Sequence, residues 1–168
     1  MLGSGSKVSV RRGQSADAVE LARVFQDSWL FAYRGIIPQL HLDSMILQRT
    51  PDWWRSAIKS ESTLVLDLAG KMVGYATFGT ARQRGPFRGE IYELYLDPLC
   101  QGLGLGEHLF EGCRHALDVR KLKGLIVWAL LDNTPACDFY WRRGGRPVAN
   151  AFTRIGGAKL EKIAFTWQ

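Results

Sequence analysis

Residues 96–110 read LDPLCQGLGLGEHLF, a stretch in which three glycines lie within five residues. Glycines at 102, 104 and 106 alternate with leucines, and a helix-like pattern of apolar residues follows them. Glycine costs backbone entropy, so it suits positions where a side chain would obstruct something. A loop of this kind directs backbone N–H groups at an anion such as a phosphate, or it makes a tight turn between a strand and a helix.

The spacing of the glycines excludes two well-known phosphate-binding loops. A dinucleotide-binding GxGxxG sequence needs Gly or Ala at its last place, where this chain has Glu107 or Leu109, depending on the first glycine chosen. A GxxxxGK[ST] loop needs a second glycine five residues after the first, and Glu107 stands there. The glycines alone therefore leave open a different anion-binding loop and a tight structural turn.

The hydrophobic pattern on both sides of this stretch predicts helices and strands in alternation. Apolar residues recur every three or four positions in the expected helices and alternate, or run continuously, in the expected strands. The expected elements are a strand at 7–11, a helix from 15 to 34, a loop over 35–43, a helix over 43–60 interrupted or restarted at Pro51, two strands within 60–81 joined by a hairpin turn at 69–71, a strand at 89–98, a helix over 104–122, a buried strand at 124–131, a helix from 133 to 144, and two strands within 146–167.

This order, β-α-α-β-β-β-α-β-α-β-β, predicts an α/β fold of the mixed α+β kind. The strand, helix and strand between residues 90 and 131 form a βαβ crossover, so these two strands should run parallel, while the other strands pair largely antiparallel. A length of 168 residues suits a single domain over 7–168. Residues 1–6, MLGSGS, are interpreted as a flexible leader or a remnant of cloning.

Composition and charge narrow the classes of function. No stretch approaches the roughly 20 apolar residues that span a bilayer, and the start lacks the apolar core of a signal peptide. The net charge is +6, but Lys and Arg are scattered with no run of five, so neither a nucleic-acid partner nor a membrane partner is predicted. Three cysteines without a CxxC pair and three histidines without metal-ligand spacing predict a cytoplasmic protein with no metal site.

Two motifs together resemble the GNAT acetyltransferase superfamily. QGLGLG, residues 101–106, resembles the Q-x-x-G-x-G acetyl-CoA loop between the fourth strand and third helix of that family, and ELYLDP, residues 93–98, resembles the strand that enters it. NTPACDFY, residues 133–140, with a glycine four residues later, is similar to the family's N-x-x-A-x-x-F-Y…G segment. AYRGIIP, residues 32–38, is similar to the exit from the first helix in many bacterial members, so the resemblance covers most of residues 8–167.

The resemblance implies an acetyl-CoA-dependent N-acetyltransferase with a splayed cofactor cleft after the fourth strand. In such a site the loop N–H groups and the N-terminus of the next helix stabilise the pyrophosphate of CoA, and each glycine removes a Cβ that would block its approach. The pantetheine arm pairs with the backbone of the preceding strand. The residues implied to bind the cofactor are Leu94, Leu96, Gln101, Gly102, Leu103, Gly104, Leu105, Gly106, Glu107, Asn133 and Tyr140.

The resemblance also implies direct attack of a primary amine on the thioester in a ternary complex. A base accepts the ammonium proton and an acid protonates the leaving thiolate. Tyr140 matches the family's tyrosine beside the sulfur and is the expected acid. Glu90 and Glu93 are the candidate bases; being three residues apart, they point to opposite faces of a regular strand unless a bulge intervenes. Glu90 is preferred, because it lies eleven residues before Gln101, where the histone-acetylating members carry their glutamate.

The acceptor end of the site should be lined by the first two helices and the loop between them, where aromatic residues gather. Trp29 and Tyr33 are the candidate substrate-contacting residues, with core packing as the alternative. The acceptor is left open among a protein N-terminus or lysine, a polyamine, an aminoglycoside and an amino acid. A catalytically inactive acetyl-CoA-binding sensor or scaffold is the alternative function, and both a monomer and a homodimer are compatible with the sequence.

Overall fold

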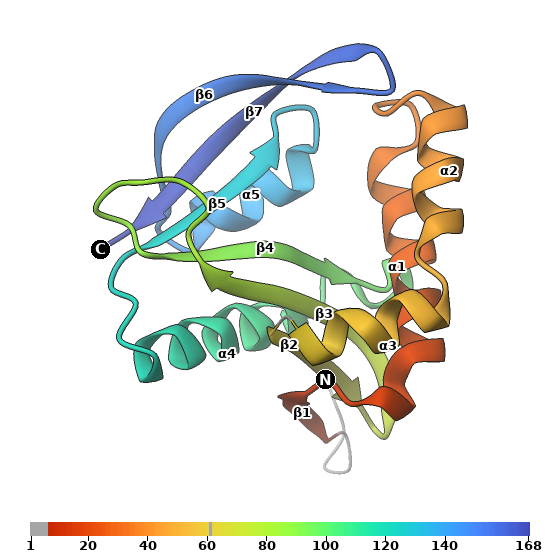
Figure 1. The fold of residues 1–168 in the computed structure, drawn as a ribbon. Helices are drawn as coiled ribbons and strands as arrows, with labels where there is room; N and C mark the ends of the chain where they lie inside the picture. Colours follow the sequence, from red (N-terminus) through yellow and green to blue (C-terminus); the bar gives the residue numbers. More distant parts are fainter. Residues whose placement is uncertain (1–6, 61) are drawn as a thin grey trace.

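Seven strands form one mixed sheet in the order β1-β2-β3-β4-β5-β7-β6 (Figure 1). The computed structural model describes residues 7–60 and 62–168, so the leader expected over residues 1–6 lies outside the described residues. The strands are β1 (Val8–Arg12), β2 (Ser62–Leu68), β3 (Lys71–Thr80), β4 (Gly89–Leu96), β5 (Leu125–Leu130), β6 (Arg146–Ile155) and β7 (Ala158–Trp167). The α-helices are α1 (Ala18–Tyr33), α2 (Gln39–Gln48), α3 (Pro51–Ser60), α4 (Leu105–Val119) and α5 (Thr134–Arg142). None of these helices is long and apolar enough to cross a membrane.

Helices cover the sheet and enclose two hydrophobic cores. One core joins α4 and α5 to the strands, with Phe110 and Tyr140 packed in the same cluster as Ile91 of β4. The other core lies under α1, α2 and α3, and its largest buried side chains include Phe25 and Trp54. The sheet therefore forms the middle of an α/β sandwich, which confirms the predicted fold class.

Helix α2 begins earlier than its sequence pattern predicts. A loop was expected over 35–43, but the helix starts at Gln39, so the loop prediction is wrong beyond Pro38. The carbonyl of Pro38 accepts hydrogen bonds from the N–H groups three and four residues later, each at 3.0 Å, and these bonds start the helix. Pro51 begins α3 as a separate helix, which is one of the two predicted alternatives, because proline suits the first helical turn.

Strands β4 and β5 run parallel but separate soon after they meet. In the described part of the chain, two residue pairs join them, Gly89 with Leu125 and Glu90 with Ile126. Beyond these pairs β4 continues against β3, and β5 continues against β7. The sheet therefore opens between the two strands, which confirms the predicted splayed cleft after the fourth strand.

Strand β4 carries a bulge where this opening begins. Two adjacent residues of β3 pair with Ile91 and Glu93, so Tyr92 is an extra residue in β4. Ile91 belongs to the core beside α4, and the bulge returns Glu93 to the opposite face, which Glu90 also occupies. Glu90 and Glu93 therefore lie on the same face of the sheet, so the opposite faces expected for a regular strand do not occur and the alternative, a bulge, is confirmed.

Candidate active site

The glycine loop between β4 and α4 requires its glycines for two different reasons. Gly102 and Gly104 have φ angles of 79° and 75°, in the left-handed region that residues with a Cβ rarely adopt. A Cβ at either position would meet no atom within 4 Å, so conformation rather than crowding explains both. Gly106 lies inside α4, where a Cβ would come within 2.9 Å of Phe139 Cε2, and therefore permits α4 to pack closely on α5.

A pocket of about 340 Å³ lies between this loop, the end of β4 and the first turns of α4 and α5; we call it the cleft pocket. Every residue implied to bind the cofactor lines it except Leu103, which is more than half exposed. Helix α1 also contributes Ser28 and Ala32 to its wall, and neither motif had indicated these residues. The two sequence motifs thus meet in one cavity.

The start of α4 carries no capping side chain. Its N-cap residue is Gly104, so no side chain bonds to the N–H groups of the first turn. These N–H groups and the helix dipole give the end of a 15-residue helix a partial positive charge that favours an anion. The loop and the helix therefore present an uncovered, electropositive backbone to the cleft pocket.

Two arginines at the end of α5 add positive charge to the same wall. Arg142 and Arg143 both line the cleft pocket. Arg143 pairs with Glu107 in the first turn of α4, and its guanidinium lies 5.0 Å from the ring centroid of Phe139. The scattered distribution of Lys and Arg in the sequence does not distinguish this basic pair from the others. Its position directly after the segment 133–140 is the sequence signal that indicates a place in the cleft pocket.

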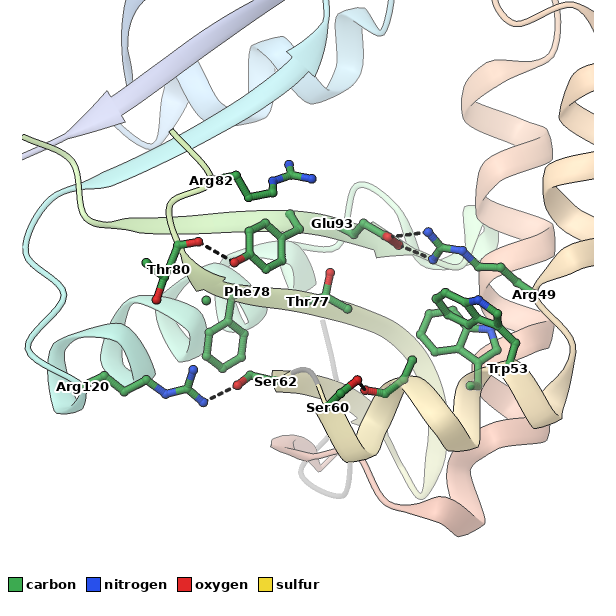
Figure 2. Close-up of a pocket in the computed structure, with 14 residues that line it drawn as sticks. Arg49, Trp53, Ser60, Ser62, Thr77, Phe78, Thr80, Arg82, Glu93 and Arg120 are labelled. Atoms are coloured by element: carbon green, nitrogen blue, oxygen red, sulfur yellow. Dashed lines mark hydrogen bonds and ion pairs between the residues drawn. The ribbon is translucent and has the colours of Figure 1, made fainter. Parts of the chain in front are cut away.

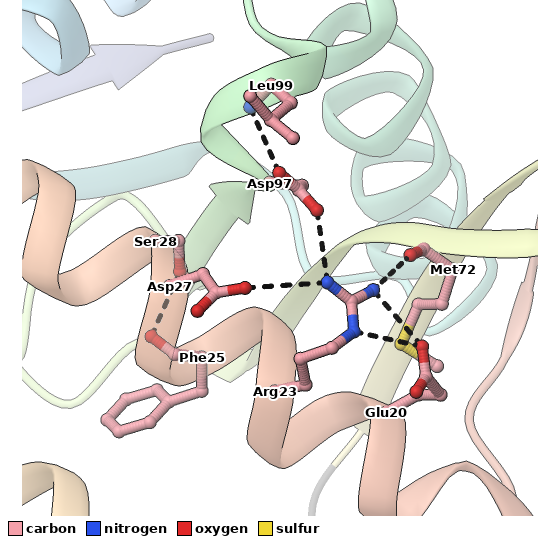
Figure 3. A network of polar contacts seen from close by, with 8 residues as sticks. All are labelled: Glu20, Arg23, Phe25, Asp27, Ser28, Met72, Asp97 and Leu99. Atoms are coloured by element: carbon pink, nitrogen blue, oxygen red, sulfur yellow. Dashed lines mark hydrogen bonds and ion pairs between the residues drawn. The ribbon is translucent and has the colours of Figure 1, made fainter.

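Arg23 ties α1 to the point where the glycine loop begins (Figure 3). Its guanidinium lies 3.1 Å from Asp97 Oδ2 and donates a hydrogen bond to the carbonyl of Met72 at 2.9 Å. Asp97 is buried and precedes the 3₁₀ turn Pro98–Cys100, where its other oxygen accepts the N–H of Leu99 at 3.0 Å. One carboxylate therefore positions both the loop entrance and the helix that borders the pocket.

Tyr140 presents a hydroxyl with no hydrogen-bond partner among the described residues to the cleft pocket. Its ring packs against aromatic neighbours, with centroid distances of 5.3 Å to Phe139 and 6.0 Å to Trp167. Burial raises the pKa of Tyr140 above its ordinary value near 10, so the hydroxyl keeps its proton at neutral pH. The side chain can therefore donate a hydrogen bond to a ligand in the pocket.

Both candidate glutamates are ion-paired, but they differ in access. Glu93 accepts two hydrogen bonds from Arg49, each 2.8 Å, and one from the hydroxyl of Tyr75 at 2.8 Å. Glu90 is only 1% exposed and accepts hydrogen bonds from the backbone N–H of Arg82 at 3.0 Å and from its guanidinium at 2.6 Å. Glu93 borders a second pocket, whereas Glu90 lines neither of the two.

This second pocket, of about 490 Å³, lies over β3 and is named the arginine groove (Figure 2). Figure 2 shows Arg49 and Trp53 at one end and Arg120 at the other. The groove is lined by Arg49, Trp53, Trp54, Ala57, Ser60, Ser62, Thr77, Phe78, Gly79, Thr80, Arg82, Tyr92, Glu93 and Arg120. Glu93 borders this groove while the next two residues of β4 line the cleft pocket, so consecutive residues of one strand serve both cavities.

Trp29 and Tyr33 lie in the aromatic core beneath α1 and line neither pocket. Trp29 Nε1 donates a hydrogen bond to the hydroxyl of Tyr75 at 3.3 Å, and the hydroxyls of Tyr33 and Tyr95 share a hydrogen bond. Burial raises the pKa of all three tyrosines above the usual value near 10. Contact of Trp29 or Tyr33 with the substrate stays a prediction; in the structure Trp29 supports the tyrosine that holds Glu93.

This combination is typical of an enzyme that acts on a CoA thioester: a splayed pair of parallel strands, a glycine loop at an uncapped helix and a tyrosine hydroxyl in the cleft. The profile of the Acetyltransferase (GNAT) family matches residues 22–144, and the chain belongs to this family of N-acetyltransferases. It is 29% identical over 161 residues to the uncharacterized N-acetyltransferase YuaI of Bacillus subtilis (strain 168), which covers 95% of this chain and 92% of YuaI. It is 25% identical over 127 residues to the mycothiol acetyltransferase of Arthrobacter sp. (strain FB24), spanning 71% of this chain but 38% of that protein.

Solved structures share the same fold. The PaiA N-acetyltransferase of Thermoplasma acidophilum in complex with coenzyme A superposes with a TM-score of 0.74 at 16% identity, over 93% of this chain and 98% of that one. The putative acetyltransferase YncA of Salmonella typhimurium with acetyl-CoA superposes with a TM-score of 0.70 at 20% identity, over 96% and 93%. At these identities the likeness shows the architecture of the chain.

Proposed function

We propose that this enzyme binds acetyl-CoA in the cleft pocket and transfers the acetyl group to a primary amine by direct attack in a ternary complex. The observation that carries the proposal is the pocket itself, where the glycine loop, the uncapped start of α4 and two arginines surround a site suited to a pyrophosphate. The Thermoplasma neighbour contains coenzyme A and the Salmonella neighbour contains acetyl-CoA, which supports the same cosubstrate here.

The parts of acetyl-CoA correspond to different parts of the pocket. Loop N–H groups around Gly104 receive the pyrophosphate, with Arg142 and Arg143 as nearby cations. Leu94 and Leu96 lie on the part of β4 that has no partner strand on the β5 side, so their backbone is available to the amide groups of the pantetheine arm. The thioester then lies beside Tyr140, close to the bulge in β4.

In the proposed reaction the amine nitrogen attacks the thioester carbonyl carbon. A C–N bond forms as the C–S bond breaks, and sulfur leaves with the bonding electron pair. Glu93 accepts the ammonium proton, directly or through one water, and Tyr140 donates a proton to the departing thiolate. We assign the base to Glu93 rather than Glu90 because Glu93 borders the arginine groove, whereas Glu90 is buried beneath Arg82.

The test of this function is turnover of acetyl-CoA, followed as free thiol, against a panel of amines. A Glu93→Gln variant should lower kcat at saturating acetyl-CoA, while Glu90→Gln should keep kcat near that of the wild type. Loss of turnover in Glu90→Gln alone would return the base role to Glu90. Tight CoA binding without turnover of any amine would favour the sensor or scaffold alternative.

The cysteines agree with transfer that needs no covalent enzyme intermediate. Burial raises the pKa of the Cys100 and Cys137 thiols above their usual value, which lowers their thiolate fraction at neutral pH. Cys113 is deeply buried, and all three thiols are unpaired. Free thiols support the predicted cytoplasmic location, because disulfides form mainly in oxidising compartments.

A further inference from the structure

We infer that the amine accepted by this enzyme carries an anionic group, a carboxylate or a phosphate, and that Arg120 pairs with this group at the far end of the arginine groove. The inference rests on the proposed function, because it concerns the acceptor of the same reaction. It selects among the acceptors that the sequence leaves open, and it disfavours purely cationic ones such as polyamines.

The charges of the groove are unequally compensated. Arg49 is paired with Glu93 at 2.8 Å, and Arg82 is paired with Glu90 at 2.6 Å. Arg120 bonds to the hydroxyl of Ser62 and pairs with no carboxylate among the described residues. Among the residues that the structure describes, these three arginines against two glutamates leave one positive charge, on Arg120.

The position of Arg120 makes this charge available to a ligand. Its guanidinium lies 5.1 Å from the ring centroid of Phe78 and lines the groove with the hydroxyls of Ser62 and Thr80. An arginine that stacks on an aromatic ring and keeps donors unpaired is suited to bind a carboxylate or phosphate through two hydrogen bonds. The far end of the groove is therefore an anion subsite.

The other end of the groove is suited to the reacting amine. Glu93 lies there, opposite Arg120 in Figure 2, and the following residues of β4 line the cleft pocket. A cavity of about 490 Å³ accepts a small molecule. An acceptor that lies along the groove thus places its ammonium at a carboxylate and its anion at a guanidinium, so each charge of a zwitterion meets its opposite.

The experiment compares matched amines that differ by one anionic group. The pairs are 6-aminohexanoate with hexylamine, and O-phosphoethanolamine with ethanolamine; cadaverine represents cationic acceptors. For the wild type, kcat/KM should be about 10-fold higher for the member of one pair that carries the anionic group than for its partner without that group, because a charge-assisted hydrogen bond changes a binding constant by about one order of magnitude. The two pairs distinguish a carboxylate from a phosphate.

Variants then test the residue. Arg120→Gln should raise KM for the preferred amine with the anionic group by about 10- to 100-fold. KM for its partner without that group should change by less than about two-fold, and kcat should change little for either amine. Arg120→Glu should reverse the preference toward cadaverine. Arg114→Gln, in α4, the helix that ends just before Arg120, but outside the groove, is the matched control and should behave as the wild type.

The wild type alone also tests the inference, whatever the stability of the variants. KM should rise more steeply with added salt for the amine that carries the anionic group than for its partner without that group. Equal use of amines with and without the anionic group, or preference for cadaverine, with normal thiol release overturns the inference and leaves the proposed function intact. Absence of thiol release with every amine overturns both.

Discussion

The hydroxyl of Tyr140 offers a direct test of the proposed chemistry, because it has no hydrogen-bond partner among the described residues. Tyr140→Phe removes this oxygen and keeps the ring in its aromatic cluster. Since no hydrogen bond within the protein is lost, the free energy of unfolding should change by less than about 0.5 kcal/mol. Affinity for CoA should also stay within about two-fold, because the proposed contacts to the phosphates and the pantetheine arm lie elsewhere in the pocket.

The effect on turnover follows from the charge that develops on sulfur. A hydrogen bond to a charged group contributes roughly 1.5–3 kcal/mol, which converts to a fall in kcat of about 10- to 150-fold. The raised pKa of Tyr140 makes the hydroxyl a weak proton donor, so we expect this modest range rather than the larger losses seen for strong general acids. The raised pKa also means that Tyr140 produces no alkaline fall in rate below about pH 10.

Thiol release under saturating acetyl-CoA measures kcat, and calorimetry with CoA measures affinity. Cys137→Ala is the matched control: Cys137 lies on the same helix, and its thiol makes long contacts to the carbonyls of Leu130 at 3.5 Å and Leu131 at 3.9 Å. This control should keep normal turnover. Wild-type kcat in Tyr140→Phe would refute the acid role, and equal losses of affinity and turnover would show that the hydroxyl only holds the cosubstrate.

The remaining predictions concern the loop, its entrance and the buried tyrosines. Gly104→Val places a Cβ at a positive φ, which costs roughly 1–2 kcal/mol and distorts the loop, so CoA affinity measured by calorimetry should fall at least 10-fold. The control Gly70→Val, at a similar φ in the remote β2–β3 turn, should lower only thermal stability. Asp97→Ala should lower the free energy of unfolding by about 1–3 kcal/mol and weaken CoA binding, because the loop entrance loses its acceptor; unchanged affinity would contradict this. Burial raises the pKa of Tyr75 and Tyr95, so above about pH 10 the unfolded chain loses protons that the folded protein keeps. Urea unfolding should therefore show stability that falls as pH rises from 9.5 to 11, and a rise would refute the assignment.

Local sequence signals predicted the parts of the fold that depend on neighbouring residues. The β2–β3 hairpin follows from Ala69 and Gly70, which adopt φ angles of 52° and 83° in a two-residue turn. The start of α5 follows from Asn133, whose side chain accepts the N–H of Ala136 at 3.4 Å. The cleft pocket was predictable for the same reason, because each of its two motifs is a short continuous segment.

Features that depend on distant pairing were not predictable in this way. The bulge at Tyr92 arises from the register between β3 and β4, and it reverses the face of Glu93 without any glycine or proline to mark it. Arg120 contacts Ser62, 58 residues away in the chain, so the arginine groove exists only after the sheet has formed. Ion pairing of both glutamates has the same origin, since Arg49 lies 44 residues before Glu93.

If acetyl-CoA binds in the proposed cleft, the short contact between β4 and β5 makes the stability of the enzyme depend on its cosubstrate. In the described chain two residue pairs join these strands. The sheet therefore consists of two smaller ladders, β1-β2-β3-β4 and β5-β7-β6, joined at these two pairs. Beyond these pairs, the backbone N–H and C=O groups of β4 on the side toward β5 need hydrogen-bond partners from water or from a bound molecule. A ligand that supplies them completes the ladder, and at 100 times its Kd it adds about 2.7 kcal/mol to the free energy of unfolding. Resistance to unfolding and proteolysis inside a cell should therefore follow the concentration of the acetyl donor, so that a shortage of substrate shortens the lifetime of the enzyme itself.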